Sequence, residues 1–388
     1  MAELTRRRTF ALLTVCALTV PVVAQQKQAA PPNPKQPPVK QSALLKLAAP
    51  WPDEEVMAAR RVEAEKRPLF ADSVPFALTL KADFKVINKD RAVEGKKDYP
   101  GVLTVANDGG KVDTFNVKLR TRGHFRLRAS SCSFVPLRVE FVKDEVKHTI
   151  FDGQKTLKLI THCQSDREFE EYPRREYLAY RALNLLTTQS FRARLTTATY
   201  VQQTDGKPII TRLGLFLEDD DDVARRMEGR IMELPRAFFK DVEPHMLTLA
   251  MMYEYMIGST DFSLYALHNV RLIRTQKNTT YMVPYDFDMT GLVNASYAIP
   301  ARELGIKTVR DRLYRGPCRT AEELEPVLEL FRSKKAQILA LYETFPGLSD
   351  TYRREAKDYL NEFFRTLERK GDVKRTFIDG QCSKKETM

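Results

Sequence analysis

Short runs of alternating apolar and polar residues fill the chain between residues 69 and 163. The runs FALTLKADF, GVLTVAN, FNVKLRTRG, VPLRVEF and TLKLITHC all repeat with a period of two. Because successive side chains of a strand point to opposite faces, this pattern predicts strands with one buried face. We expect a mostly β region here, preceded by a short helix over residues 53–66.

A helical period replaces the alternation at residues 173–186. Leucine and alanine side chains share one face there, and Pro173 is placed in the first turn, where helices tolerate proline. Strands are expected again over residues 193–202 and 208–219. The acidic run at residues 218–222 then opens a short helix. We interpret its carboxylates as a solvated helix N-terminus, and cation binding is the alternative.

The C-terminal part of the chain is predicted to be mainly helical. Residues 244–257 are apolar almost all round and stop at Gly258, which indicates a buried helix with a glycine C-cap. A polar loop and a β-hairpin follow. Thr320 and Glu323 form a capping box, and an apolar stripe predicts a last helix over residues 352–370. Strands followed by helices make the expected fold class α+β.

The first 24 residues have the form of a signal peptide. Three arginines precede an apolar run at residues 10–23, which is too short to span a bilayer. We expect cleavage after Ala24, by an ordinary secretory or a twin-arginine route, and hence an exported protein. Residues 25–52 form a Pro/Gln-rich linker. The linker is followed by a β-rich lobe over residues 53–217 and a mostly helical lobe over residues 218–388. We expect no integral membrane span after removal of the signal.

The chain is strongly basic, with 63 Lys and Arg against 51 Asp and Glu and a net charge of +12. Loss of three arginines and Glu3 with the signal lowers this charge by two, to +10. Such a balance suits anionic partners, for example nucleotide phosphates or cell-surface polymers. Export separates the chain from genomic DNA, so no DNA partner is expected. A composition of 43% hydrophobic and 29% charged residues excludes multi-span membrane, collagen-like and fully disordered proteins.

Four cysteines remain after removal of the signal. An even number in an exported protein favours disulfides, and three pairings are possible. We expect Cys132–Cys163, because these residues flank strand-like runs, and Cys318–Cys382, because these two bracket a helical region whose end needs fixing. No Cys/His spacing typical of zinc sites is present.

Acidic and amide side chains gather around the predicted hairpin. Asp261 follows the buried helix, Asn269 begins the hairpin, and Asp286 and Asp288 follow it. Carboxylates from these two places can converge on one cation, and their oxygens suit Mg²⁺ or Mn²⁺. In an extended backbone Asp286 and Asp288 would point to the same face; the competing interpretation is a turn. HExxH, GxSxG and GxxxxGK[ST] motifs are absent.

The order of these elements resembles that of a protein kinase, where a strand lysine and a helix glutamate precede a catalytic loop and a metal-binding aspartate. The corresponding candidates are Lys158, Glu176, Asp261, Asn269 and Asp286. Further motifs are Arg122-Gly123, Asp166-Arg167, GLFLED at residues 214–219 and YDFDMTG at residues 285–291. With these motifs the chain resembles the CotH-type spore-coat family of atypical kinases, as a secreted bacterial relative, over about residues 70–295.

The resemblance implies a two-lobed kinase-like core with extra C-terminal helices, and transfer of a phosphoryl group from ATP to a protein or cell-surface acceptor. In that scheme Lys158 meets the nucleotide phosphates and Glu176 positions the lysine. Asp261 orients and deprotonates the acceptor hydroxyl. The divalent cation is held by Asp286, Asp288 and Asn269.

Structural interpretations compete with these roles. For Lys158 the alternative is an exposed strand lysine, and for Asp261 it is a capping residue that follows Gly258. Glu176 is predicted in the first turn of its helix, where the helix dipole favours an acid in any case. Arg122 belongs to a stripe of basic residues at every second position, which Gly123 interrupts. This basic stripe either binds phosphates or a polyanion, or lies on the solvent-exposed side of an edge strand. The stripe consists of Arg120, Arg122, His124, Arg126 and Arg128.

A second hypothesis concerns the whole chain. Asp261 and Asn269 are eight residues apart, no GxGxxG loop precedes the strands, and Tyr285 stands where the family has a tryptophan. The alternative function is therefore a catalytically inactive kinase-fold scaffold that binds an anionic cell-surface partner through its basic face.

Overall fold

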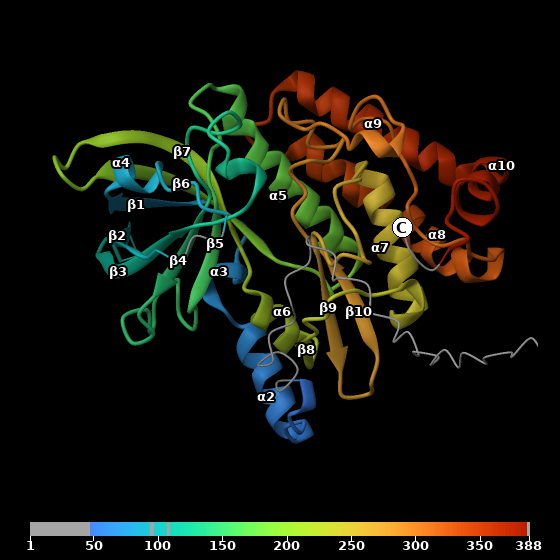
Figure 1. Cartoon of the computed structure of the whole chain (residues 1–388), viewed down its shortest axis with the longest axis horizontal. Coiled ribbons are helices and arrows are strands. Elements are labelled where there is room, and N and C mark those ends of the chain that lie inside the picture. The colour runs from blue at the N-terminus through green and yellow to red at the C-terminus, as the bar shows by residue number, and fades with distance from the viewer. Residues whose placement is uncertain (1–46, 94–96, 107–108, 386–388) are drawn as a thin grey trace, which may run out of the picture. The chain divides into compact units, whose positions relative to one another are not determined.

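A closed β-barrel forms the first part of the computed structural model, which describes residues 47–93, 97–106 and 109–385 (Figure 1). The strands close in the order β1-β2-β3-β4-β5-β7-β6. Neighbours are antiparallel except β1 and β6, which are parallel. The strands are β1 (Phe76–Ala82), β2 (Tyr99–Ala106), β3 (Val112–Thr121), β4 (Leu137–Phe141), β5 (Thr156–Ile160), β6 (Ala193–Gln202) and β7 (Pro208–Leu217).

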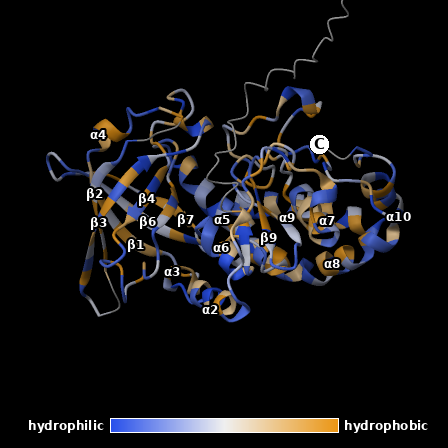
Figure 2. Ribbon diagram, turned by 60° about the horizontal axis from the view of Figure 1, so that its bottom comes forward, coloured by the Kyte–Doolittle hydropathy of each residue, from blue (hydrophilic) through white to orange (hydrophobic). Residues whose placement is uncertain are grey.

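The predicted alternation along these strands is confirmed. Apolar and polar residues alternate along the barrel strands (Figure 2), and most of the apolar ones are buried. Phe151 lies at the centre of an aromatic core, with its ring centroid 4.7 Å from that of Phe141 and 5.5 Å from that of Phe115. Arg120 lies on β3, which pairs with β2 on one side and β4 on the other, and the rest of the basic stripe lies in the β3–β4 connection, so the edge-strand interpretation is wrong.

Helices and a small sheet make up the second part, so the fold is a mixed α+β fold. The sheet has the order β10-β9-β8, and β8 had no sequence signal that we recognised. Helix α5 packs against β6 and β7 on one side and α8 on the other, and Figure 1 shows it between the barrel and the helices α7 and α9. The elements are α5 (Glu168–Leu186), α6 (Asp220–Arg226), α7 (Pro244–Ile257), α8 (Ala321–Thr344), α9 (Asp350–Glu368), β8 (Gly229–Ile231), β9 (Val270–Thr275) and β10 (Thr280–Pro284).

Short helices complete the described chain. They are α2 (Glu54–Glu65), α3 (Pro68–Ala71), α4 (Phe84–Ile87) and α10 (Lys370–Val373), with single turns at Phe125–Leu127, Phe239–Asp241, Arg302–Leu304 and Lys374–Ile378. The expected helix near residues 53–66 is thus confirmed as α2. No helix in the described ranges is long and apolar enough to cross a membrane. The predicted signal peptide and most of the linker lie outside the described residues.

The helix predicted at residues 173–186 is longer than expected. Helix α5 begins at Glu168, so Pro173 lies inside it and Glu176 is in its third turn, not its first. Acidic side chains at Glu168, Glu170 and Glu171 occupy the first turn, where the helix dipole stabilises them. The helix dipole therefore does not account for Glu176.

Three other helix predictions are confirmed. Gly258 caps α7 with a φ of +67°, a left-handed conformation that costs a glycine little. Thr320 and Glu323 form the expected capping box at the start of α8. The whole predicted apolar stripe is buried on α9, and its residues are Tyr352, Ala356, Tyr359, Leu360, Phe363, Phe364 and Leu367.

Both predicted disulfides are present. Cys132 joins Cys163, which ties the β3–β4 connection to the segment before α5, and Cys318 joins Cys382 near the C-terminus. The first bond is surrounded by a small apolar cluster that includes Phe169, Tyr172 and Val293. This cluster therefore connects the β3–β4 connection, the start of α5 and the segment that follows the Asp286-Phe287-Asp288 motif.

Candidate functional site

The loop between α7 and β9 brings Asp261 and Asn269 together. The Asn269 side chain donates hydrogen bonds to the Asp261 backbone oxygen, at 2.6 Å, and to its Oδ2 atom, at 3.3 Å. His268 Nε2 lies 3.2 Å from Asp261 Oδ1, and this contact is the main reason why the pKa of His268 is raised. The Asp261 side chain keeps 48% of its surface exposed. An exposed carboxylate held from two sides is suited to contacting an external hydroxyl group.

The Asp286-Phe287-Asp288 motif is not extended. Asp286 has a φ of +68°, so the expected same-face arrangement of the two aspartates does not form. The Asp286 N–H donates a 2.8 Å hydrogen bond to the Tyr180 hydroxyl on α5. Phe287 is buried with its ring centroid 4.7 Å from that of Tyr180. The motif is therefore anchored to the helical core.

Glu176, Asp286 and Asp288 form an acidic cluster. Glu176 is only 1% exposed, and its Oε1 atom has no hydrogen-bond partner among the described residues. Burial, followed by the charges of Asp288 and Asp286, raises the pKa of Glu176 well above its usual range. Burial and the Asp286 charge raise the pKa of Asp288 to about 7, although Asp288 accepts a 3.0 Å hydrogen bond from Tyr297. Close carboxylates whose pKa values rise are stabilised by a bound cation.

A divalent cation is chemically compatible with this cluster. Carboxylate and amide oxygens are hard ligands, and Mg²⁺ commonly takes one or two carboxylates together with substrate phosphates. Within the described ranges no three His, Cys, Asp or Glu side chains are arranged to hold a metal ion by themselves. A metal bound here would therefore need further oxygen ligands, such as those of a nucleotide.

Lys158 is paired with Asp220, not with Glu176. The Lys158 Nζ atom lies 2.5 Å from Asp220 Oδ1, and Arg271 Nε donates to Asp220 Oδ2 at 2.8 Å. The Lys158 ammonium also lies 4.8 Å from the centre of the Tyr285 ring. Burial lowers the pKa of Lys158 to about 8, while Asp220 opposes this effect. For Asp220, burial is outweighed by Lys158 and Arg271, which lower its pKa to about 2.

Arg122 lies near enough to Lys158 and to the acidic cluster for its charge to act on both. Burial is the main cause of both shifts; the Arg122 charge adds to the lowering of the Lys158 pKa and opposes the rise of the Glu176 pKa. The guanidinium makes no hydrogen bond or ion pair with another described residue, while the Arg122 N–H donates to the Pro136 oxygen across the β3–β4 connection. A cation without a partner beside carboxylates is available for an anionic ligand.

The basic stripe is interrupted as expected. Gly123 has a φ of +93°, and the single turn Phe125–Leu127 follows it. Arg120 consequently points to Asp98, whereas Arg126 donates to the Thr161 backbone oxygen and faces Asp288 and Glu176. Only part of the stripe is thus near the acidic cluster.

Two residues of the acidic run at residues 218–222, Glu218 and Asp222, are buried, and only Asp221 is fully exposed, which corrects the solvated interpretation. Glu218 is fully buried and accepts hydrogen bonds from Arg192 and Arg226. Asp222 is paired with Arg67 and Arg225. Each of these carboxylates has an arginine distant in sequence, which explains why local composition did not reveal the pairing.

Asp220, Arg271 and Tyr297 were not predicted as site residues. A partial signal for Arg271 was present, since it is a charged residue within the apolar strand VRLIRT. Asp220 was visible only as one of several consecutive acids. Tyr297 had no signal, because its contact with Asp288 depends on how the segment after β10 folds back.

No family model matches the sequence, and no curated protein is similar to it. A crystal structure of the Helicobacter pylori proinflammatory kinase CtkA is similar over 63% of this chain and 92% of that chain, with 11% sequence identity and a TM-score of 0.34. A likeness of this size does not establish a common fold. The functional argument therefore depends on the site residues themselves.

Proposed function

We propose that this chain is an exported kinase-like phosphotransferase. It would transfer a phosphoryl group from a nucleotide, ATP in the first instance, to a hydroxyl group of a protein or cell-surface polymer. The observation that carries the proposal is Arg122, a cation without a hydrogen-bond or ion-pair partner for its guanidinium among the described residues, whose charge acts on both Lys158 and the acidic cluster. Phosphoryl transfer needs this combination, because cations neutralise the phosphates and carboxylates hold the metal. The two disulfides are consistent with export.

Each side chain has a defined task in this proposal. Arg122 and Lys158 bind the nucleotide phosphates. Asp286, Asp288 and Asn269 hold Mg²⁺ or Mn²⁺, which supplies charge neutralisation. Asp261 accepts a hydrogen bond from the acceptor hydroxyl, orients it and takes up its proton. Glu176 does not pair with Lys158 in this structure. Its proposed role is to add negative charge beside Asp286 and Asp288.

A catalytically inactive scaffold is the second candidate. The observation that favours it is the Lys158–Asp220 ion pair. In this pair Asp220 already binds the lysine ammonium group that the phosphates of a nucleotide would contact. Exposed His124 and Arg128 at the β3–β4 connection would then contact an anionic surface polymer.

Thermal unfolding with ligands separates the two candidates. The chain from residue 25 is heated with ATP, with Mn²⁺ or Mg²⁺, and with both together. A phosphotransferase shows a melting temperature that rises most with both, since a ligand at 100 times its Kd adds about 2.7 kcal/mol. The Arg122→Gln variant should lose this rise, and Arg128→Gln, a matched arginine exposed on the same connection, should keep it. An unchanged wild-type melting temperature with all three additions would favour the scaffold.

A further inference from the structure

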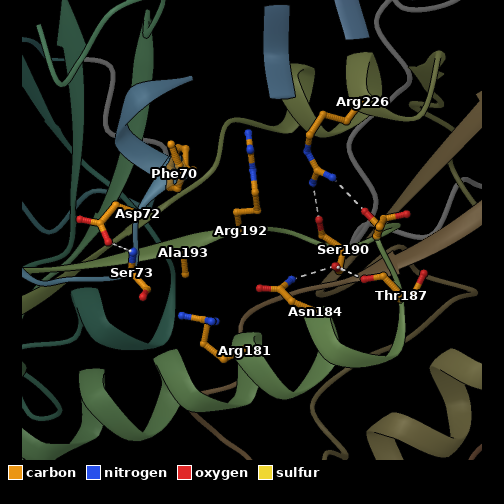
Figure 3. A pocket seen from close by; sticks show the side chains of 12 residues that line it. Phe70, Asp72, Ser73, Arg181, Asn184, Thr187, Ser190, Arg192, Ala193 and Arg226 are labelled. Carbon is orange, nitrogen blue, oxygen red and sulfur yellow. Dashed lines mark hydrogen bonds between the residues drawn. The ribbon is translucent and has the colours of Figure 1, made fainter. Parts of the chain in front are cut away.

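A hollow of about 390 Å³, lined by both polar and apolar side chains, lies apart from the candidate site. It is bounded by α3, the end of α5, the start of β6 and α6, and Figure 3 shows the side chains that line it. None of its lining residues belongs to the candidate site. Its polar walls include Arg181, Arg192, Arg226, Ser73 and Thr188, and Phe70 forms an aromatic wall.

Positive charge exceeds negative charge around this hollow. Arg192 and Arg226 share a single carboxylate, that of Glu218, at 2.7 and 2.8 Å. Arg181 donates to the Tyr177 hydroxyl at 2.7 Å and has no carboxylate partner among the described residues. Arg192, Arg226 and Glu218 together carry one net positive charge, and Arg181 adds a second.

The one carboxylate that lines the hollow does not cancel this excess. Asp72 is paired with Arg194, at 3.1 Å, so this pair is neutral. A hollow with two uncompensated positive charges favours an anion, and most strongly a dianion.

Donors for such a ligand are already in place. The Ser73 and Thr188 hydroxyls make no hydrogen bond with other described residues, and Arg181 has donors left beyond its bond to Tyr177. Figure 3 shows Arg181 rising from α5 with its guanidinium toward Ser73. The turn that carries Thr188 is fixed, since the Ser190 hydroxyl donates to the Thr187 oxygen at 2.8 Å and accepts from Asn184 at 2.8 Å. The hollow is therefore preorganised.

We propose that this hollow is a binding site for a phosphate dianion, free or carried by a small phosphomonoester. Arg181 is its principal ligand, because a guanidinium can bind two phosphate oxygens side by side. Ser73 and Thr188 donate to the remaining oxygens. The volume exceeds that of phosphate alone and leaves room beside Phe70 for a small polar group such as a sugar. This proposal does not depend on the proposed phosphotransferase activity.

Melting curves of the mature chain with inorganic phosphate or with glycerol phosphate, against sodium chloride of equal ionic strength, test the site. The wild type should show a saturable rise in melting temperature with phosphate and not with chloride. A lower apparent Kd for glycerol phosphate identifies the monoester as the preferred form, and equal values identify free phosphate. Arg181→Gln should weaken the apparent affinity at least tenfold.

Three further variants make the result specific. Arg174→Gln removes an arginine of the same helix outside the hollow, and Arg122→Gln removes the unpaired cation of the candidate site; both should keep the rise. The double variant Ser73→Ala with Thr188→Ala should weaken the affinity for phosphate, and neither residue is packed in the core. This variant still tests the site if Arg181→Gln fails to fold. The proposal is overturned if the wild type shows no saturable rise, if the Arg181 and hydroxyl variants bind as the wild type does, or if Arg122→Gln abolishes binding.

Discussion

Lys158 on β5 and Asp220 at the start of α6 form an ion pair with a 2.5 Å contact between Nζ and Oδ1. The two residues are 62 positions apart, and the pair connects the barrel to the segment that leads into the helical part. Asp220 also accepts from Arg271 on β9, so a single carboxylate joins three elements. Any nucleotide that uses Lys158 must share it with Asp220 or displace Asp220.

The Asp220→Asn variant tests the structural role of this pair. Removing one partner of a buried ion pair leaves an uncompensated charge, which costs about 3–5 kcal/mol when both groups are fully buried. Because Asp220 and Arg271 are partly exposed, we expect the lower end of this range. Urea unfolding gives the free energy of unfolding. A loss below 1 kcal/mol would mean that the pair contributes little, whereas Asp221→Asn, at an exposed neighbour, should have almost no effect.

The pKa of Asp288 predicts how stability changes with pH. A carboxyl group whose pKa rises from 3.8 to about 7 on folding binds more protons in the folded state between these values. Stability contributed by this group is therefore present at low pH and is lost as the pH rises from about 4 to about 7. A tenfold change in proton affinity corresponds to about 1.4 kcal/mol.

Comparison with Asp288→Asn isolates this effect from other titrating groups. The stability of the variant relative to the wild type should increase by more than about 1.4 kcal/mol between pH 4 and pH 8. Mg²⁺ or Mn²⁺ should reduce the difference at pH 8, because the cation favours the ionised carboxylates. A difference that stays constant across this pH range would show that Asp288 is not perturbed.

Much of this architecture could be predicted from the sequence. The barrel strands, α7 with its Gly258 cap and the capping box of α8 follow from local patterns of period and capping, and the disulfides follow from the even number of cysteines and the segments that they flank. The start of α5 was placed too late because Pro173 was assumed to mark a first turn. Three acids before it proved to be the stronger signal for the helix start.

The arrangement of charges could not be predicted in the same way. Lys158 was assigned to Glu176 because they are a strand lysine and the next helix glutamate. In the structure Glu176 faces Asp286, Asp288 and Arg126 instead. Partner choice depends on how β5, α5 and α6 pack, and no short segment of sequence contains that information. The left-handed conformation of Asp286 had no sequence signal for the same reason.

The first disulfide should affect nucleotide binding, and the second should not. Cys132–Cys163 holds the connection that carries Arg122 and Arg126, while Cys318–Cys382 lies near the C-terminus. Chain entropy predicts a stabilisation of about 4 kcal/mol for either bond. Serine replacement of each pair should lower the melting temperature in both variants. Only the Cys132/Cys163 variant should also lose the shift caused by ATP with Mn²⁺, and equal shifts in both variants would contradict the positioning role.

Asp261→Asn and Asp286→Asn should separate binding from turnover. Asp286→Asn removes a proposed metal ligand, so both metal-dependent nucleotide affinity and rate should fall. Asp261→Asn should leave affinity nearly unchanged and lower the rate about 10²–10⁴-fold, the usual loss for a general base. Calorimetric titration with ATP and Mn²⁺ measures the affinities. Equal losses of affinity in the two variants would contradict the separate roles.

Transfer of labelled phosphate from ATP is the most direct test of the central proposal. The mature chain, with its disulfides intact, is incubated with γ-labelled ATP, Mg²⁺ or Mn²⁺ and a surface-polymer or protein acceptor, and the label is followed in the acceptor and in the chain itself. The proposal predicts metal-dependent incorporation by the wild type and by Asp221→Asn, with loss in Asp286→Asn. If the folded wild type transfers no label with either metal and binds no ATP, the phosphotransferase proposal is wrong, and the anionic-polymer scaffold accounts better for the basic chain.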